Sequence, residues 1–227
     1  MKRYIFKILT GIALFGIVSC SDILEEEPHS VITPDLFKTA DGLRYGLTGA
    51  YNGLRYITGT EPTQCSTVLG TDEYTSAASG TKELDMTPDN GGTGINSATG
   101  SINVYWNYPF SYINTCNGII EFGTEAGLSE SLIAEAYFLR AYYYFNVVQM
   151  FGGVPLDLGA GDLKFNTNPT TLSERNTQEE VYTAIINDMK YAAANLPVNP
   201  RQPGCPFQAT AIHYLAKIYL THGDDEL

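Results

Sequence analysis

The residues best suited to chemistry flank a polar stretch of the chain that is rich in Gly, Ser, Thr and Asn. Two carboxylates can cleave a glycosidic bond when they face it from both sides, but adjacent carboxylates such as Asp72 and Glu73 rarely do so. Aromatic rings can pack against the C–H faces of a sugar while amides and carboxylates bind its hydroxyls. The sequence therefore predicts ligand binding rather than cleavage, although Trp106 could instead simply fill the core. The candidate ligand-binding residues are Asp72, Glu73, Tyr74, Tyr105, Trp106 and Asn107.

Signatures of catalysis are missing from the rest of the sequence. There is no GxSxG elbow, HExxH pair or phosphate-binding loop, and "GGTG" at residues 91–94 lacks the remainder of a dinucleotide fingerprint. His29, His213 and His222 are not spaced as ligands of one metal. The formal net charge of −12 argues against a nucleic-acid partner, which would require clustered Lys and Arg. We therefore expect a protein that is not an enzyme and that uses no cofactor or metal.

The N-terminus has the layout of a secretory signal peptide. Cationic residues near the start precede an apolar run from Ile8 to Val18, which is shorter than the roughly 20 residues of a membrane-spanning helix. The letters "IVSC" that follow resemble the lipobox of bacterial lipoproteins. We expect residues 1–19 to be a lipoprotein signal peptide and Cys20 to carry lipid that anchors the protein at a membrane surface. The alternative is an ordinary cleaved signal followed by an incidental cysteine.

Residues 20–34 form a polar, acidic segment, "CSDILEEEPHSVITP", which we expect to be a tether. An acidic stretch directly after a lipidated cysteine resembles the surface-export signal of Bacteroidetes lipoproteins. With Cys20 lipidated, Cys65, Cys116 and Cys205 remain, an odd number without CxxC spacing. The sequence leaves open whether two of them form a disulfide or all are buried thiols.

Residues 39–58 have the apolar spacing of a helix with one buried face, and Thr39 is placed to cap it. Glycines at positions 42, 46, 49 and 53 each cost about 1 kcal/mol relative to alanine in a helix interior. We expect close approach of a neighbouring helix to compensate for this cost.

The stretch "EAYFLRAYYYFNVVQMFGGVPL", from Glu135 to Leu156, predicts a helix that protein covers on most sides and that ends at "FGGVP". Glu135 and Arg140 make a lipid-embedded span untenable. Arg140 lies opposite a narrow polar arc that contains Glu135, Asn146 and Gln149. A buried guanidinium is costly unless it is paired, so we expect an acidic or backbone-carbonyl partner for Arg140 and a structural role.

Two further helices follow. "EEVYTAIINDMKYAAANLP" has one apolar face and acidic residues in its first turn, which the helix dipole favours. The last helix matches the tetratricopeptide pattern at Ile212, Leu215, Ala216 and Tyr219. We expect Ala216 to let a partner helix approach and Tyr219 to wedge the pair. A weaker copy of the pattern occurs at Tyr137, Arg140, Ala141 and Tyr144.

These patterns predict an all-α fold for residues 35–227, with tetratricopeptide-like helical hairpins and long irregular loops. The pattern of the last helix requires a second helix to bury its face, and the chain ends soon after Gly223. We therefore expect a domain that is truncated at its C-terminus.

Several segments, in order, resemble the SusD/RagB family of nutrient-binding outer-membrane lipoproteins. They are the lipobox, "YGLTGAYNGL", "YWNYPFSYINTCNGII", "AEAYFLRAYYYFNVVQMFGGVPL" and "ATAIHYLAKIYLTHGD". The resemblance implies an all-α surface protein that captures oligosaccharides without cleaving them. It also implies delivery of the sugar to a TonB-dependent (SusC-like) outer-membrane transporter, with Asp72, Trp106 and Asn107 as candidate sugar contacts. A tetratricopeptide-like scaffold that binds only protein is the alternative.

Overall fold

The computed structural model describes residues 35–60, 66–69, 71, 73–74, 100–168 and 172–223. The predicted signal peptide and tether, Cys20, Cys65 and Asp72 lie outside these ranges. The described secondary structure comprises η2 (Leu36–Lys38), α2 (Ala40–Thr58), α4 (Gly100–Phe122), α5 (Glu130–Phe151), α6 (Gln178–Asn195) and α7 (Gln208–His222). The β-type pairing in these ranges is one isolated bridge between Asp157 and Asp162. The all-α prediction is confirmed.

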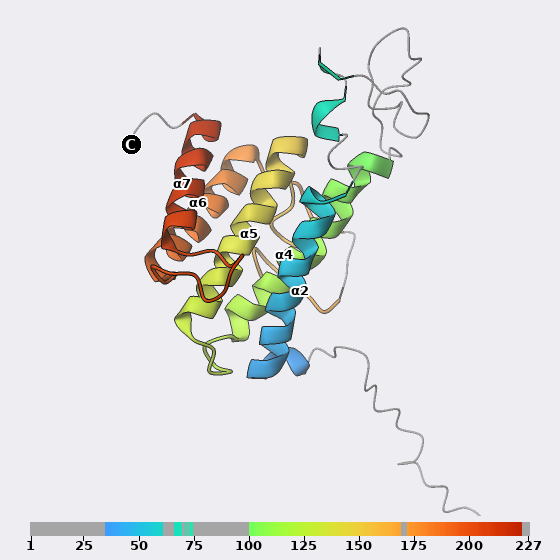
Figure 1. Cartoon of the computed structure of the whole chain (residues 1–227). Coiled ribbons are helices and arrows are strands. Elements are labelled where there is room, and N and C mark those ends of the chain that lie inside the picture. The colour runs from blue at the N-terminus through green and yellow to red at the C-terminus, as the bar shows by residue number, and fades with distance from the viewer. Residues whose placement is uncertain are drawn as a thin grey trace, which may run out of the picture. The chain divides into compact units, whose positions relative to one another are not determined.

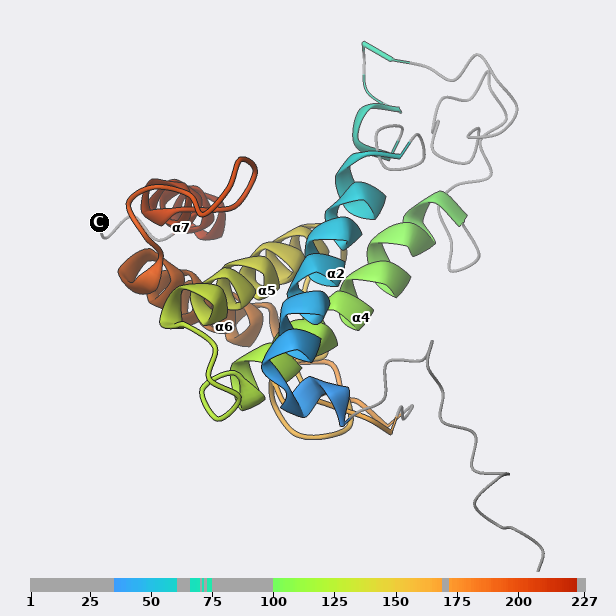
Figure 2. The ribbon, with the colours of Figure 1, turned by 60° about the horizontal axis from the view of Figure 1, so that its bottom comes forward.

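Each long helix packs mainly against the next one along the chain. α2 contacts α4, α4 contacts α5, α5 contacts α6, and α6 contacts α7 (Figure 1). Figure 2 shows the row from a second direction, with α7 and α2 on opposite sides of α5. Neighbour-to-neighbour packing of this kind is typical of helical repeat proteins. Among the described helices, none has both the length and the apolar content needed to cross a membrane.

Thr39 caps α2, because its side chain accepts a hydrogen bond from the Gly42 N–H at 3.1 Å. The expected close approach holds at two of the helix glycines. A methyl group at Gly53 would collide with Tyr112 of α4 and Tyr143 of α5, and one at Gly46 would crowd Phe37 and Thr115. Gly42 is approached closely by Leu36 of η2, a 3-10 helix just before α2, and Gly49 faces open space. The prediction is therefore wrong for Gly49, and at Gly42 the close neighbour is this short helix rather than one of the long helices.

α5 is the central helix of the domain and is buried along most of its length. Its buried positions include Phe138, Leu139, Tyr143 and Phe145, which contribute to one continuous apolar core. Gly152 ends the helix with a φ of 72°, a conformation that glycine adopts without steric cost. The prediction of a covered helix that stops at "FGG" is confirmed.

α6 begins with a capping box, in which Thr177 accepts from the Glu180 N–H and Glu180 accepts from the Thr177 N–H. Its predicted apolar face is buried against α5 and α7.

Cys116 and Cys205 are buried free thiols.

α7 packs against α6 through a different face from the one that the repeat pattern predicted. Ala211 and Ile218 are buried, whereas Ile212 is 53% exposed and Ala216 is exposed. No described helix covers Ala216, so the expected approach of a partner helix there does not occur within these residues. Tyr219 is partly buried and lies 5.8 Å from the ammonium group of Lys190 on α6.

Candidate ligand-binding site

The C-terminal ends of α2 and α5 and the N-terminal part of α4 meet at the upper end of the bundle in Figure 1. Aromatic rings gather there. We call this region the aromatic end and define it by Tyr56, Trp106, Tyr108 and Phe151. It contains the predicted α4 site residues and some that sequence reasoning missed.

Trp106 is both packed and accessible. Its indole contacts Phe110 with centroids 5.0 Å apart and Phe151 with centroids 5.1 Å apart, both edge to face. The side chain is still 38% exposed. One part of the indole is therefore packed against aromatic neighbours while the rest faces solvent, so Trp106 does not simply fill the core, and its role as a ligand contact stays a prediction.

Tyr105 and Asn107 lie on either side of Trp106 in the sequence but have different environments. Consecutive helical residues are about 100° apart, so they cannot all share one surface. Tyr105 is 4% exposed, whereas Asn107 is exposed. Tyr105 can therefore reach a ligand only through a pocket, while Asn107 and Trp106 face solvent directly.

Tyr108 stacks on Tyr56 of α2, with ring centroids 4.5 Å apart and planes 3° from parallel. Both rings are partly exposed. This pair lies at the contact of α4 with α2, whereas Trp106 lies at the contact of α4 with α5. The sequence did not single out Tyr56 or Tyr108 as site residues, because pairing across two helices leaves no signal in local spacing.

Glu73 and Tyr74 are exposed and belong to a short described segment. Within the described residues, no hydrogen bond joins either one to α4. Their role as ligand contacts remains a prediction.

A pocket of about 350 Å³ opens beside Tyr105 at the same end of the bundle. Its walls come from the ends of α2 and α5 and from residues near position 67. The lining residues are Ile57, Thr58, Thr67, Tyr105, Asn146, Gln149 and Met150. The pocket combines apolar surface with hydroxyl and carboxamide groups, the mixture that small-molecule sites usually show.

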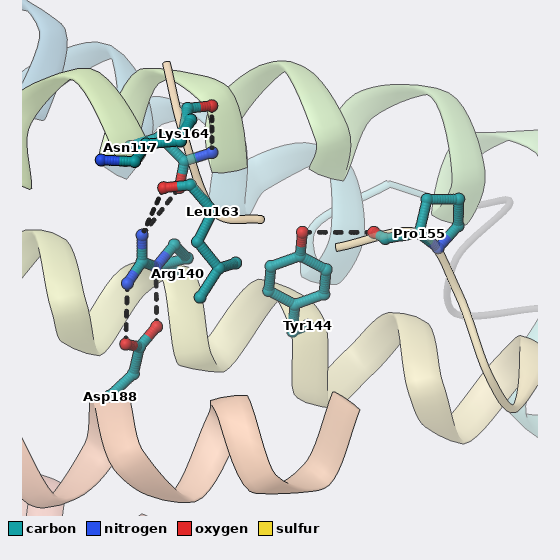
Figure 3. A network of polar contacts seen from close by, with 7 residues as sticks. All are labelled: Asn117, Arg140, Tyr144, Pro155, Leu163, Lys164 and Asp188. Carbon is teal, nitrogen blue, oxygen red and sulfur yellow. Dashed lines mark hydrogen bonds and ion pairs between the residues drawn. The ribbon is translucent and has the colours of Figure 1, made fainter. Parts of the chain in front are cut away.

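The interior of the bundle holds a different polar group, the Arg140 network, which we define as Arg140, Asp188 and Asn117 (Figure 3). Arg140 donates to Asp188 through Nε at 2.7 Å and Nη2 at 2.8 Å, and to Oδ1 of Asn117 through Nη1 at 2.8 Å. It also reaches the carbonyl of Leu163 at 3.5 Å, and Asn117 donates to the carbonyl of Lys164 at 3.1 Å. The network thus joins α4, α5, α6 and the loop after α5.

Asp188 is the acidic partner expected for Arg140, and Leu163 supplies the backbone carbonyl. Burial lowers the pKa of Arg140, but the attraction of the Asp188 carboxylate outweighs it and raises the pKa above its usual value. The guanidinium therefore stays charged inside the protein, and four of its five N–H groups donate to protein partners. Such a group can position helices but has no free face for a ligand.

Glu135, whose side chain is buried, forms a second ion pair with Arg201 from the loop before α7, whose side chain is 42% exposed. Both guanidinium–carboxylate distances are 3.0 Å, and the hydroxyl of Tyr51 donates to Glu135 at 2.6 Å. Burial and the neighbouring Glu135 raise the pKa of Tyr51. Glu135 is thus buried rather than solvated, and it ties α5 to α2 and to the loop. In the described part of the chain, no group of three or more His, Cys, Asp or Glu side chains could hold a metal ion.

The fold defines an all-α domain whose helices pack neighbour to neighbour, as in helical repeat proteins. The sequence profile of the SusD-like family, described as "Starch-binding associating with outer membrane", matches residues 22–220. The chain belongs to the SusD-like family, whose members are binding proteins rather than enzymes and are associated with the outer membrane.

Individual relatives agree with this assignment. SusD-like protein P2 of Formosa agariphila is 31% identical over 243 residues, covering 99% of this chain and 44% of the relative. A solved structure named "Laminarin binding SusD-like protein" is 26% identical, with a TM-score of 0.64, covering 82% of this chain and 41% of that one. A SusD superfamily protein from Bacteroides vulgatus shares the fold, with 21% identity and a TM-score of 0.68. The chain spans less than half the length of these relatives.

Proposed function

We propose that the protein binds oligosaccharides at the cell surface through the aromatic end of its helical domain. The observation that carries the proposal is Trp106, whose indole is held between Phe110 and Phe151 yet remains 38% exposed. A rigid, partly exposed ring offers a stacking face at little entropic cost. The exposed Asn107 beside it supplies a carboxamide for hydroxyl groups. Asp72, Glu73 and Tyr74 remain proposed contacts.

The class of sugar that the protein binds can be tested with fragments of the polysaccharides after which its relatives are named. One related structure is named for laminarin and the family for starch. We expect calorimetric titration with laminarin oligosaccharides and malto-oligosaccharides to give saturable binding to at least one series. No heat with either series, together with release of shorter sugars, would contradict the proposal and favour a glycan-processing enzyme.

Delivery to a TonB-dependent, SusC-like transporter forms part of the proposal and rests on the family alone. It predicts that the protein co-purifies with such a transporter after mild detergent extraction of the outer membrane. Recovery of the protein free of any transporter under conditions that preserve other outer-membrane complexes would contradict it.

The proposed anchor is a lipid on Cys20, after removal of residues 1–19. We expect Cys20→Ala to leave the protein unprocessed and to remove it from the lipid-modified fraction. Mass spectrometry of the N-terminal peptide and metabolic labelling with a fatty-acid analogue would check this. An unmodified Cys20 in the wild-type protein would instead favour an ordinary secretory signal.

The exposed face of α7 favours a second function, a scaffold that binds only protein. Ile212 and Leu220 are 53% and 79% exposed. A contiguous exposed apolar patch often marks a protein contact. The scaffold alternative predicts tight binding to the transporter that Ile212→Ser weakens, with no heat from any glycan.

A further inference from the structure

Two carboxamide side chains of α5, those of Asn146 and Gln149, line the pocket beside Tyr105, although most of α5 is apolar or aromatic. Asn146 and Gln149 are one turn apart on this helix, so their side chains lie on adjoining positions of one face. The nearby residues of α5 are mostly buried and apolar. Asn146 is partly buried there and Gln149 is exposed, so both carboxamides are accessible from the pocket that they line.

Local hydrogen bonds hold both carboxamides in place. Asn146 Nδ2 donates to the carbonyl of Tyr142 at 2.7 Å, and Gln149 Nε2 donates to the carbonyl of Phe145 at 2.7 Å. Each bond uses one N–H of its carboxamide and does not use the oxygen, which can accept two hydrogen bonds. The two side chains are thereby oriented before any ligand arrives, which reduces the entropy lost on binding.

The remaining walls define the chemistry of the ligand. Ile57, Met150 and Tyr105 supply apolar surface, and Thr58 adds a hydroxyl. None of the described residues that line the pocket carries a formal charge. Walls of this kind give no compensation for the desolvation of an ionic ligand, so they favour an uncharged molecule with both hydroxyl groups and apolar C–H faces.

The volume and position of the pocket further limit the kind of ligand that fits. At about 350 Å³, the pocket is near the small end of the range of roughly 300–1,000 Å³ for ligand sites. It therefore suits one sugar unit rather than a whole oligosaccharide. Met150 lines the pocket while the adjacent Phe151 contacts Trp106, and Tyr105 and Trp106 are likewise adjacent on α4. A chain of sugars with one unit in the pocket would continue toward Trp106.

We propose that Asn146 and Gln149 form a neutral sugar subsite, in which their carboxamides bind the hydroxyls of one unit of an oligosaccharide that also contacts Trp106. The inference rests on the proposed glycan-binding function and assigns specificity to α5. Recognition here depends on hydroxyl positions, whereas stacking on Trp106 alone would be tolerant of sugar identity.

The test compares Asn146→Leu and Gln149→Leu with Asn195→Leu. Asn195 on α6 makes the same kind of local bond, from Nδ2 to the carbonyl of Tyr191 at 2.9 Å, but does not line this pocket. All three variants lose a carboxamide bonded to its own helix. We expect each of the first two to weaken binding of the laminarin or malto-oligosaccharide that the wild type binds by about 3- to 10-fold, and Asn195→Leu to leave it unchanged.

A second measurement does not depend on the variants folding. In the unsubstituted protein, the side-chain amide NMR signals of Asn146 and Gln149 should shift on titration with the sugar, while those of Asn195 should stay in place. Glycan binding with equal affinity in all three variants, or with no shift of the two pocket amides, would overturn the subsite and leave the proposed function intact. Absence of any binding by the unsubstituted chain to both sugar series would overturn both.

Discussion

The Arg140 network and the aromatic end combine the same ingredients, aromatic rings and polar side chains on helices, but they differ in how the polar groups are satisfied. The guanidinium of Arg140 is 4% exposed and donates to Asp188, Asn117 and Leu163. At the aromatic end, Trp106 retains an open face and the carboxamides of Asn146 and Gln149 border a pocket. The first region uses its polar groups to join helices, and the second leaves them available at the surface.

The two regions contain similar residue types, but we expect the Arg140 network to affect stability and the aromatic end to affect sugar binding. α5 contributes to both regions, with Arg140 near its middle and Phe151 at its end. Substitutions in the first region should therefore act on unfolding, and substitutions in the second should act on the affinity for sugar. The following predictions test that separation.

The largest effect is expected for Arg140→Met. The change leaves Asp188 as a buried carboxylate without its cation, and the free energy of unfolding should fall by about 3–5 kcal/mol. Urea denaturation followed by circular dichroism would measure it. Combining the change with Asp188→Leu should recover much of the loss, because no unpaired charge then remains.

Arg44→Met is the control for this substitution, because Arg44 forms an exposed pair with Asp41 that should contribute at most about 1 kcal/mol. If Arg140→Met weakened sugar binding while the unfolding free energy stayed the same, the separation would fail and Arg140 would belong among the ligand contacts.

Gly53→Ala tests the packing of α2 against the helices that carry both regions. A methyl group there meets the ring of Tyr112 and the hydroxyl of Tyr143, so overpacking should cost about 1–3 kcal/mol of stability. Gly49→Ala, four residues earlier, meets no atom within 4 Å and should stabilise the helix by up to about 1 kcal/mol. Thermal unfolding of the pair should give shifts of opposite sign, and equal shifts would contradict the observed approach of the helices.

Trp106→Ala tests whether the aromatic end contributes to sugar binding. Loss of the indole should weaken oligosaccharide binding by about tenfold, which corresponds to about 1.4 kcal/mol, because the stacking face disappears. Tyr45→Ala, at another exposed aromatic on α2, is the matched control and should leave the affinity unchanged. Calorimetry would measure both, and equal affinities for the two variants would exclude Trp106 as a sugar contact.

Thr177→Ala should have a moderate effect, of about 1 kcal/mol of stability, because it removes the capping box at the start of α6. The affinity for sugar should not change, since α6 takes no part in the aromatic end. A loss of affinity in a fully folded variant would show that the two regions are coupled through α6.

The smallest effect concerns acid stability. Hydrogen bonds from the Thr177 backbone and side chain and from Asn176 lower the pKa of Glu180. A carboxylate with a lowered pKa in the folded state stabilises the protein above its unfolded pKa, and this contribution is lost as the pH falls through the folded pKa. Glu180→Gln should therefore lose less stability than the wild type over that acidic range, as measured by urea denaturation at stepped pH.

Much of the fold could be predicted because its signals are local. The apolar spacing of α2, α5 and α6, the cap at Thr39 and the stop at Gly152 each depend on residues within a few positions of one another. The buried state of Arg140 also followed from its place on the helix. Its partner did not, because Asp188 is 48 residues away and only the packing of α5 on α6 brings the two together.

The candidate site was less predictable for the same reason. Tyr105 and Trp106 look alike in sequence, but the rotation of α4 buries one ring and exposes the other. The stack of Tyr56 on Tyr108 and the pocket between Tyr105 and Asn146 arise where separate helices end side by side. Sequence patterns within one helix carry no information about these contacts between helices.

The sequence by itself determined the helical class, the family and the need for a partner at Arg140, because periodicity, motifs and the cost of a buried charge are properties of short segments. Only the tertiary structure decided which aromatic rings are buried, which are exposed, and where a pocket forms. Those outcomes depend on how the helices are rotated and stacked, and that arrangement is set by the summed packing of side chains that are distant in the chain.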